Sequence, residues 1–167
     1  FATSDGELTS TAGVVNIQVT SVNDAPDVLA GEDQIISLPI NAVALAGQVT
    51  DDNFSGLNDI QVLWSKVIGP GGVTFANATN ENTSATFDAP GVYVLRLTAD
   101  DGFFIGFDEL VVTVNAPPLV CAGTDLTNTF PAGVILAGFV SDDLLPTNGT
   151  LSTAWSKASG PGTVIFN

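Results

Sequence analysis

Residues 43–52 read VALAGQVTDD, and residues 134–143 read VILAGFVSDD. The similarity continues outward from this stretch in one register, because Trp64-Ser65-Lys66 recurs 91 residues later as Trp155-Ser156-Lys157. Solenoid repeats are roughly 20–50 residues long, whereas a whole β-sandwich domain has about 100 residues. The sequence therefore contains copies of a unit that has the size of a domain.

The apolar residues of the repeated unit alternate with a period of two. In residues 92–99 the odd-numbered positions hold Tyr, Leu, Leu and Ala, and in residues 110–114 the even-numbered positions hold Leu, Val and Val. Such alternation predicts strands with one buried face, as in antiparallel sheets, and no segment keeps a helical period. Gly-Pro-Gly at 69–71 and 160–162 favours turns. We predict an all-β chain of tandem sandwiches.

Two aromatic residues and the cysteine are predicted to be structural. Trp64 follows an apolar run, and Tyr93 follows Pro90-Gly91, so both suit the core of an immunoglobulin-like sandwich. Cys121 is the only cysteine, which excludes a disulfide within the chain. The repeat aligns it with Leu29, which favours a small buried side chain, although pairing between chains stays open.

The chain divides into three parts by its repeats. The letters ATSDG at 2–6 resemble TADDG at 98–102, so the first residues match the end of the unit. We predict the last strands of a preceding module in residues 1–25, a complete sandwich in residues 26–116 and the N-terminal half of a second sandwich in residues 117–167. Because the chain opens with neither Met nor a signal peptide, we expect an internal piece of a longer protein.

The composition excludes several classes of function. The chain has 18 Asp and Glu residues against 3 Lys and Arg residues, a net charge of −15, and it has no His. Nucleic-acid binding requires clustered Lys and Arg, and a membrane span requires about 18 or more apolar residues in a run, so we predict neither nucleic-acid binding nor membrane insertion. No nucleophile elbow, zinc motif or phosphate loop is present, and we predict that the chain is not an enzyme.

Several short motifs together resemble a PKD domain. They are Ala30-Gly31-Glu32-Asp33-Gln34, Leu38-Pro39, the stretch 47–52, Trp64-Ser65, Gly69-Pro70-Gly71, Gly91-Val92-Tyr93 and Asp100-Asp101-Gly102. The opening residues through Val22-Asn23-Asp24-Ala25-Pro26 resemble the end of a cadherin-like bacterial repeat. The resemblance implies tandem immunoglobulin-like sandwiches of the PKD type in a large extracellular protein.

Calcium is the predicted cofactor. In an immunoglobulin-like topology the doublets Asp51-Asp52 and Asp100-Asp101 lie at one end of the sandwich, where the chain arrives from Asn23-Asp24. Converging carboxylates repel each other unless a cation neutralises them, and calcium takes six to eight oxygen ligands. Calcium sites in PKD-like and cadherin-like modules imply the same role by analogy, and Asp5 would serve the junction with the preceding module. The alternative is that these Asp residues only form turns.

An apolar hairpin is predicted at the same end, in residues 103–107, which read FFIGF. Exposed apolar patches usually mark contacts, so we predict that this end packs against the neighbouring module of the same chain. The predicted interface comprises Phe54, Phe103, Phe104 and Ile105, with Leu144 and Leu145 at the matching loop of the next copy. Two alternatives stay open, namely that Phe107 folds into its own core and that the hairpin contacts other copies in a fibre.

These features predict an extracellular or cell-surface structural or adhesive module, part of a stalk, adhesin or fibre stiffened by calcium. Its partners would be the neighbouring modules, other copies of the chain, or a ligand on a cell surface or polymer. The alternative is an accessory PKD module that presents substrate to a secreted polysaccharide- or protein-degrading enzyme. That role requires exposed planar aromatic residues, whereas Trp64, Tyr93 and Trp155 are predicted to be buried.

Overall fold

The computed structural model describes residues 1–52, 60–147 and 149–166 of the chain. Within these residues every regular element is a strand, and none is a helix long and apolar enough to cross a membrane. The strands are β1 (Asp27–Leu29), β2 (Gln34–Ser37), β3 (Ala42–Ala46), β4 (Gln48–Thr50), β5 (Gln61–Ile68), β6 (Val73–Phe75), β7 (Asn82–Phe87), β8 (Gly91–Asp100), β9 (Ile105–Asn115), β10 (Leu119–Cys121) and β11 (Phe139–Ser141).

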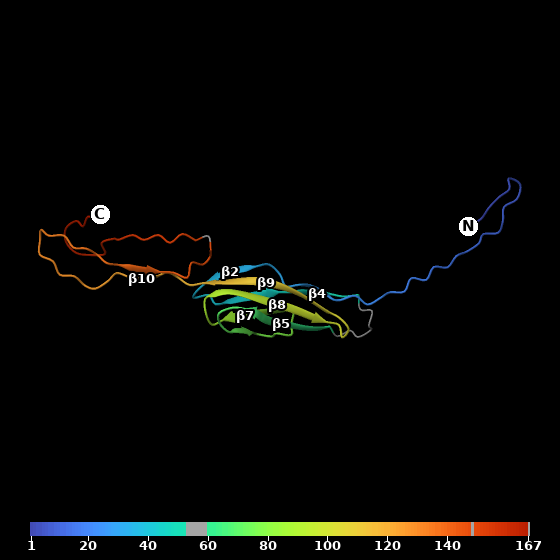
Figure 1. Ribbon diagram of the computed structural model, residues 1–167, viewed down its shortest axis with the longest axis horizontal. Coiled ribbons are helices and arrows are strands. Elements are labelled where there is room, and N and C mark those ends of the chain that lie inside the picture. Colours follow the sequence, from blue (N-terminus) through green and yellow to red (C-terminus); the bar gives the residue numbers. More distant parts are fainter. Residues whose placement is uncertain (53–59, 148, 167) are drawn as a thin grey trace.

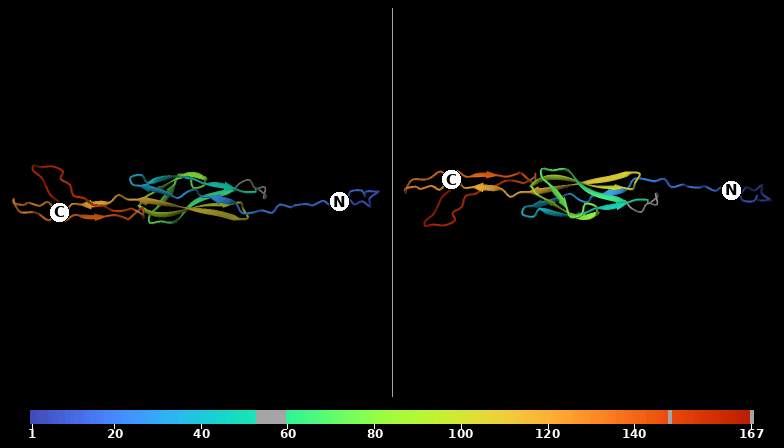
Figure 2. Two further views of the ribbon diagram at one scale, coloured as in Figure 1. Left: turned by 90° about the horizontal axis from the view of Figure 1, so that it is seen from above. Right: turned by 90° about the horizontal axis from the view of Figure 1, so that it is seen from below.

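Strands β1 to β9 form an immunoglobulin-like sandwich. One sheet has the order β2-β9-β8-β5, the other has the order β3-β7-β6, and β1 pairs with β4 beside them. All these pairs are antiparallel except β2 with β9, which is parallel. The sandwich lies in the middle of an elongated molecule, with the two termini on opposite sides of it (Figures 1 and 2). The predicted all-β, immunoglobulin-like fold is confirmed, and the predicted tandem arrangement of such sandwiches stays a prediction.

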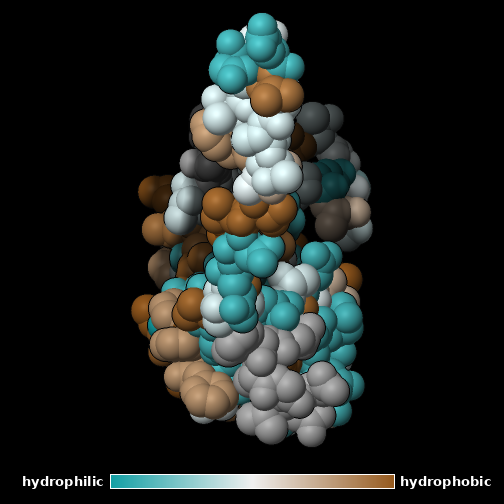
Figure 3. All heavy atoms as spheres, turned by 90° about the vertical axis from the view of Figure 1, so that its right-hand side faces the viewer, coloured by the Kyte–Doolittle hydropathy of each residue, from teal (hydrophilic) through white to brown (hydrophobic). Residues whose placement is uncertain are grey.

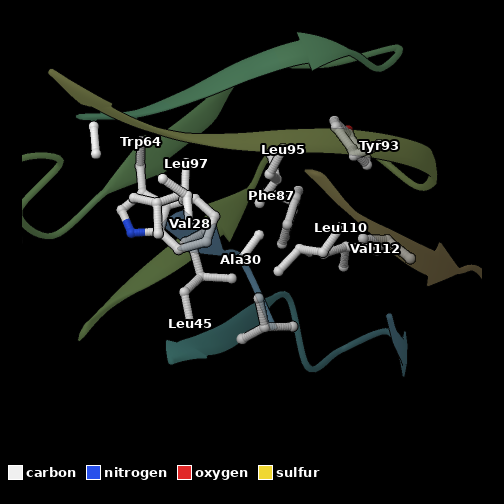
Figure 4. Packing of buried hydrophobic residues seen from close by; sticks show 14 residues of the cluster. Val28, Ala30, Leu45, Trp64, Phe87, Tyr93, Leu95, Leu97, Leu110 and Val112 are labelled. Atoms are coloured by element: carbon white, nitrogen blue, oxygen red, sulfur yellow. The ribbon is translucent and has the colours of Figure 1, made fainter. Parts of the chain in front are cut away.

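The core lies between the two sheets and follows the period of two in the sequence. Tyr93, Leu95, Leu97 and Ala99 of β8 are fully buried. Figure 4 shows Trp64 of β5 beside Leu97, with Leu95 and Tyr93 further along β8. Burying each large apolar side chain contributes about 1.5–3 kcal/mol, so this row supplies much of the stability of the sandwich. The predicted burial of Trp64 and Tyr93 is confirmed.

Tyr93 forms a tyrosine corner. Its hydroxyl donates a hydrogen bond of 2.7 Å to the carbonyl of Ala89, and its ring packs on Phe87 with centroids 4.7 Å apart. The turn at Gly69 passes directly over the ring, where a Cβ atom would lie 2.1 Å from Tyr93 Cδ1 and where φ is +151°. Only glycine fits this position, which explains the Gly-Pro-Gly motif.

The N-terminal segment of the sandwich runs beside β9 in one continuous parallel register. In the ladder, Gln34 pairs with Val112 and Ser37 pairs with Asn115, a constant offset of 78 residues. Side-chain hydrogen bonds extend the same offset toward the N-terminus. The Asp108 carboxylate accepts a bond of 2.8 Å from the Ala30 amide, and the Asp33 carboxylate accepts one of 2.8 Å from the Val111 amide.

Among residues 117–147 and 149–166, β10 and β11 form one strand pair, and the rest is chain without regular secondary structure. Strands β10 and β11 pair Val120 with Val140, as β1 and β4 pair Val28 with Val49. The Cys121 side chain is exposed, so its predicted burial is wrong. The reason is alternation, because Leu29, its counterpart in the sandwich, also points outward. The predicted burial of Trp155 is also wrong, since it is 44% exposed, against 2% for Trp64. In the described part of the second copy only β10 and β11 pair, so no second sheet covers Trp155.

Residues 1–22 are exposed throughout and extend away from the sandwich (Figure 1). Within them, a bridge between Ser4 and Thr9 closes a short turn. The Asp5 carboxylate accepts hydrogen bonds from the Glu7 and Leu8 amides in that turn. The predicted division of the chain at residues 25 and 116 stays a prediction.

Candidate functional site

The candidate site lies where the chain reaches the sandwich from its N-terminal segment, and we call this the linker end. It comprises Asn23 to Pro26, the β8–β9 turn at residues 100–104, and Asp51-Asp52 after β4. Figure 3 views the molecule from this side, and hydrophilic and hydrophobic side chains lie next to each other there. Phe54 lies outside the described residues, so its predicted contact stays a prediction.

Asp101 joins the turn to the linker. Its Oδ1 atom accepts hydrogen bonds of 2.7 Å from the amides of Phe103 and Phe104, and its Oδ2 atom accepts one of 2.8 Å from Asn23 Nδ2. The side chain is only 3% exposed. The Phe104 amide, then the Phe103 amide and the Asn23 side chain, outweigh the effect of burial and lower the pKa of the carboxyl below its ordinary value.

Asp100 is also used inside the turn, because its Oδ1 atom accepts a hydrogen bond of 2.8 Å from the Gly102 amide. Gly102 has φ of +89°, a conformation that favours glycine. The predicted turn role of the Asp100-Asp101 doublet is therefore realised. It leaves the predicted metal role untested, since a carboxylate oxygen has two lone pairs.

Asp142-Asp143, the counterpart of Asp51-Asp52 in the second copy, also joins a turn to a linker. Asp142 and Asp143 accept hydrogen bonds of 3.2 and 3.1 Å from the Leu144 and Leu145 amides. The other oxygen of Asp143 accepts one of 3.0 Å from the Ala116 amide. At both ends of the sandwich, an Asp that holds a turn thus also binds the adjoining linker.

Several side-chain oxygen atoms at these two junctions are inaccessible to solvent. Asn23 Oδ1, Asn115 Oδ1 and Asp142 Oδ1 accept no hydrogen bond within the described part of the chain, and Asp51 Oδ1 is inaccessible as well. A buried oxygen atom without a donor is costly unless a cation or water meets it. These oxygen types fit calcium.

The structure brings together only part of the predicted metal set. Among residues 1–52, 60–147 and 149–166, no three His, Cys, Asp or Glu side chains are grouped so that they could hold a metal ion. Asn23 contacts Asp101, and Asp24 is exposed beside them. Asp5 lies in the extended N-terminal segment (Figure 1), where the Leu8 and Glu7 amides lower its carboxyl pKa.

The apolar hairpin projects from the linker end. Phe103 is 68% exposed, and Phe104 and Ile105 are exposed as well. The alternative that Phe107 enters the core is not realised, because its exposed ring lies under the Arg96 guanidinium, 4.3 Å from the ring centroid to Cζ. In the second copy Leu144 is exposed, and Leu145 is half-buried.

The sequence reasoning missed three residues that hold the linker. Asp33 and Asp108 bind backbone amides across the strands, and Gly106 lies against the linker, where a Cβ atom would be 2.0 Å from the Pro26 carbonyl oxygen. Asp108 is half-buried and hydrogen bonded within β9. The glycine between Ile105 and Phe107 was the available signal, since glycine in a strand marks a close approach of another backbone.

Comparison with known proteins gives consistent relatives. The profile described as "K319L-like, PKD domain" matches residues 30–114, about half of the chain. The mouse dyslexia-associated protein KIAA0319-like protein is 29% identical over 163 residues, which is 90% of this chain. The chain spans 15% of the length of that relative.

Two solved structures were also similar. The PKD domain of the KIAA 1837 protein is 27% identical, with a TM-score of 0.45, and the match covers 65% of this chain and all of that domain. A PKD domain of human KIAA0319 is 20% identical, with a TM-score of 0.48, and the match covers 69% of this chain and all of that domain.

Proposed function

Because the chain belongs to the family of K319L-like PKD domains, we propose that its sandwich is an extracellular spacer module that carries tension within a longer surface protein. One observation carries this proposal. The first and last strands that pair within the four-stranded sheet, β2 and β9, lie side by side and parallel, while the chain reaches and leaves the sandwich at opposite ends (Figure 1).

This arrangement places the strand pair in shear when the chain is pulled. Tension on residue 23 draws β2 toward the linker end, and tension on residue 116 draws β9 toward the opposite end. All the hydrogen bonds of the ladder are then loaded at once instead of one after another. The bonds of Ala30 to Asp108 and of Val111 to Asp33 lie in the same register and share the load.

Single-molecule force spectroscopy tests the load-bearing role. In a Cys121→Ser background, which removes the exposed thiol, the chain is pulled once by its two termini. It is pulled a second time between cysteines introduced at Ala89 and Ala116, which both lie at the end opposite the linker. The second geometry separates β8 from β9 one pair at a time, so we expect a several-fold lower unfolding force. Equal forces in the two geometries would contradict the proposal.

Calcium at the linker end is the second part of the proposal. Asn23 and the Asp101 carboxylate, which are in contact, would bind the ion first. Asp24, Asp51, Asp52 and Asp100 would move toward it to complete the site, because no three of these carboxylates are grouped in the described structure. The support is the buried Asn23 oxygen that accepts no hydrogen bond within the described residues, beside the Asp101 carboxylate. Bound calcium would link the linker to the turn and so stiffen the junction. Asp5 would act at the preceding junction.

Thermal unfolding of the whole chain, in millimolar calcium and then in excess chelator, tests this second part. A ligand of the native state at about 100 times its Kd adds roughly 2.7 kcal/mol. We expect this gain to vanish when Asp51→Asn and Asp101→Asn are combined and to persist in the control Asp125→Asn, which changes an exposed residue outside the sandwich. No calcium effect in the unaltered chain would reduce the doublets to turn residues and leave the mechanical role untouched.

The exposed hairpin supports contact with the neighbouring module. Phe103, Phe104 and Ile105 stand at the end that a preceding module would face. Leu144 stands in the next copy in the loop that matches the one after Asp51-Asp52. Covering these side chains would limit bending between consecutive modules. Within the sandwich, Trp64 and Tyr93 are buried and offer no exposed aromatic ring for the accessory role in a secreted hydrolase, whereas Trp155 of the second copy is 44% exposed.

A further inference from the structure

The outer face of the four-stranded sheet carries several large apolar side chains, although a solvent-facing sheet surface is usually polar. Its polar residues include Arg96, Thr98 and Asp100 on β8 and Glu109 and Thr113 on β9. The outward positions of β8 and β9 alternate with the core row, and they include Val92, Val94, Phe107 and Val111. Exposed Leu63 on β5 and Ile35 on β2 widen this surface on both sides. We call this surface the outer sheet face.

The opposite face of the sandwich differs in character. The exposed residues of β3, β6 and β7 there are small or polar, among them Ala42, Ala44, Ala46, Thr74 and Thr86. The large apolar side chains are thus concentrated on one of the two sheets. A surface of this kind marks a contact.

The outer sheet face has one pair of opposite charges at its centre. Arg96 and Glu109 are directly opposite residues of β8 and β9, and Arg96 Nε donates a hydrogen bond of 2.8 Å to Glu109 Oε1. Arg96 Nη2 donates to the same oxygen, and the guanidinium lies over the Phe107 ring. Within the described residues, Glu109 Oε2 and Arg96 Nη1 have no hydrogen-bond partner. Both side chains are 36% exposed.

We propose that the outer sheet face binds a second copy of this chain, face to face about a two-fold axis. The chain has a net charge of −15, so two copies repel each other over most of their surface. The centre of the outer sheet face is the exception, because the charges of Arg96 and Glu109 cancel there and Asp100 lies only at the end of the same row. If the two-fold axis lies in the interface midway between Arg96 and Glu109, Arg96 of each copy faces Glu109 of the other copy. Arg96 Nη1 and Glu109 Oε2 are then available for hydrogen bonds between the copies.

The size of the face suits such a contact. The ten residues of β8 span about 34 Å at roughly 3.4 Å per residue, and four strands at about 4.8 Å spacing span about 19 Å. Because β9 has eleven residues, β5 eight and β2 only four, a contact over the whole face would bury on the order of 540 Å² on each copy. The total of about 1,100 Å² is just above the roughly 1,000 Å² that a specific interface requires.

Charge exchange tests the proposal by analytical ultracentrifugation of the whole chain over a concentration series. We expect the unaltered chain to dimerise. Arg96→Glu and Glu109→Arg alone should each weaken self-association at least about tenfold, because like charges then face each other across the interface. An equimolar mixture of the two variants should restore a dimer that contains one copy of each, since the side chains that face each other across the interface again carry opposite charges. The control Ala44→Glu adds a charge to the other sheet and should leave the dimer unchanged.

Three results would overturn the proposal. The first is a monomeric unaltered chain up to millimolar concentration, which would leave the face for a different protein. The second is a dimer that persists in both single variants, which would assign the contact to the exposed strands of residues 117–167. The third is a mixture of correctly folded variants that stays monomeric, with folding checked by circular dichroism.

Discussion

Asp101 illustrates how one side chain combines two roles at the linker end. Its first oxygen holds the β8–β9 turn through the amides of Phe103 and Phe104, and its second oxygen holds the linker through Asn23. Because one carboxylate serves both, the shape of the turn and the position of the linker are coupled. Neutralising the Asp101 carboxylate therefore weakens both the β8–β9 turn and the attachment of the linker.

The acid sensitivity of the sandwich follows from this carboxylate. Its folded pKa is lowered by the Phe104 amide first, so the ionised form is favoured by folding. The stability it contributes is complete above the unfolded pKa, about 3.9, and is lost as the pH falls through the lower folded pKa. In urea titrations we expect Asp101→Asn to have a lower free energy of unfolding than the unaltered chain at neutral pH. This difference should disappear below about pH 4. A difference that is independent of pH would contradict this origin.

The tyrosine corner gives a second prediction for a single residue. Tyr93→Phe keeps the ring against Phe87 but removes the hydrogen bond to the Ala89 carbonyl. Loss of one such bond costs about 1 kcal/mol, so the free energy of unfolding should fall by that amount in a denaturant titration. An unchanged value would show that the hydroxyl has no net role in stability.

Sequence reasoning succeeded for residues whose role is set by local pattern. Trp64 and Tyr93 were placed in the core by apolar alternation and by the preceding Pro-Gly turn, and both are buried there. Asp33 and Asp108 were not recognised, because their partners are backbone amides 78 residues away in the chain. A single sequence contains no signal for a contact of that range.

At the level of elements, the linker is held by a glycine as well as by hydrogen bonds. Gly106 of β9 allows the Pro26 carbonyl to approach, and a Cβ atom there would lie 2.0 Å from that oxygen. Gly106→Ala should displace the linker and lower stability by about 1–3 kcal/mol, the usual cost of overpacking. The matched control is Gly133→Ala, because a Cβ atom at Gly133 meets nothing within 4 Å.

Hydrogen exchange measures this displacement directly. The Ala30 amide donates to Asp108 in the native chain and should exchange faster in Gly106→Ala, while amides inside the β5–β8 pair should be unaffected. Equal protection of Ala30 in the two proteins would show that the linker tolerates the added methyl group.

The strands differ in how far their pairing could be predicted. Residues 92–99 and 110–114 alternate clearly, and they form β8 and β9 with the expected buried faces. The parallel pairing of β2 with β9 was not predicted, because the four residues of β2 carry no clear alternation and their partner lies far along the chain. The repeat correctly aligned Cys121 with Leu29, but Leu29 itself faces outward, so the alignment did not imply that Cys121 is buried.

In the whole molecule, the sandwich is packed around a core, and the segments before and after it are mostly exposed. Residues 1–22 are exposed throughout, and most of residues 117–166 are exposed, whereas the core of the chain lies in the sandwich. Proteases cut where backbone can open at little cost. Brief digestion with a protease of broad specificity should therefore leave a fragment close to residues 23–116, identified by mass spectrometry. Early cuts within β8 or β9 would contradict the predicted domain boundaries.

The different surroundings of the two tryptophans have an optical consequence. Trp64 is sealed in the core and donates its indole hydrogen bond to the Glu81 carbonyl, whereas the indole of Trp155 meets solvent. Acrylamide should quench the emission of Trp155 by collision and leave the blue-shifted emission of Trp64. The chain thus carries two native fluorophores, one in each repeat, and the loss of the protected one reports melting of the sandwich without an added label.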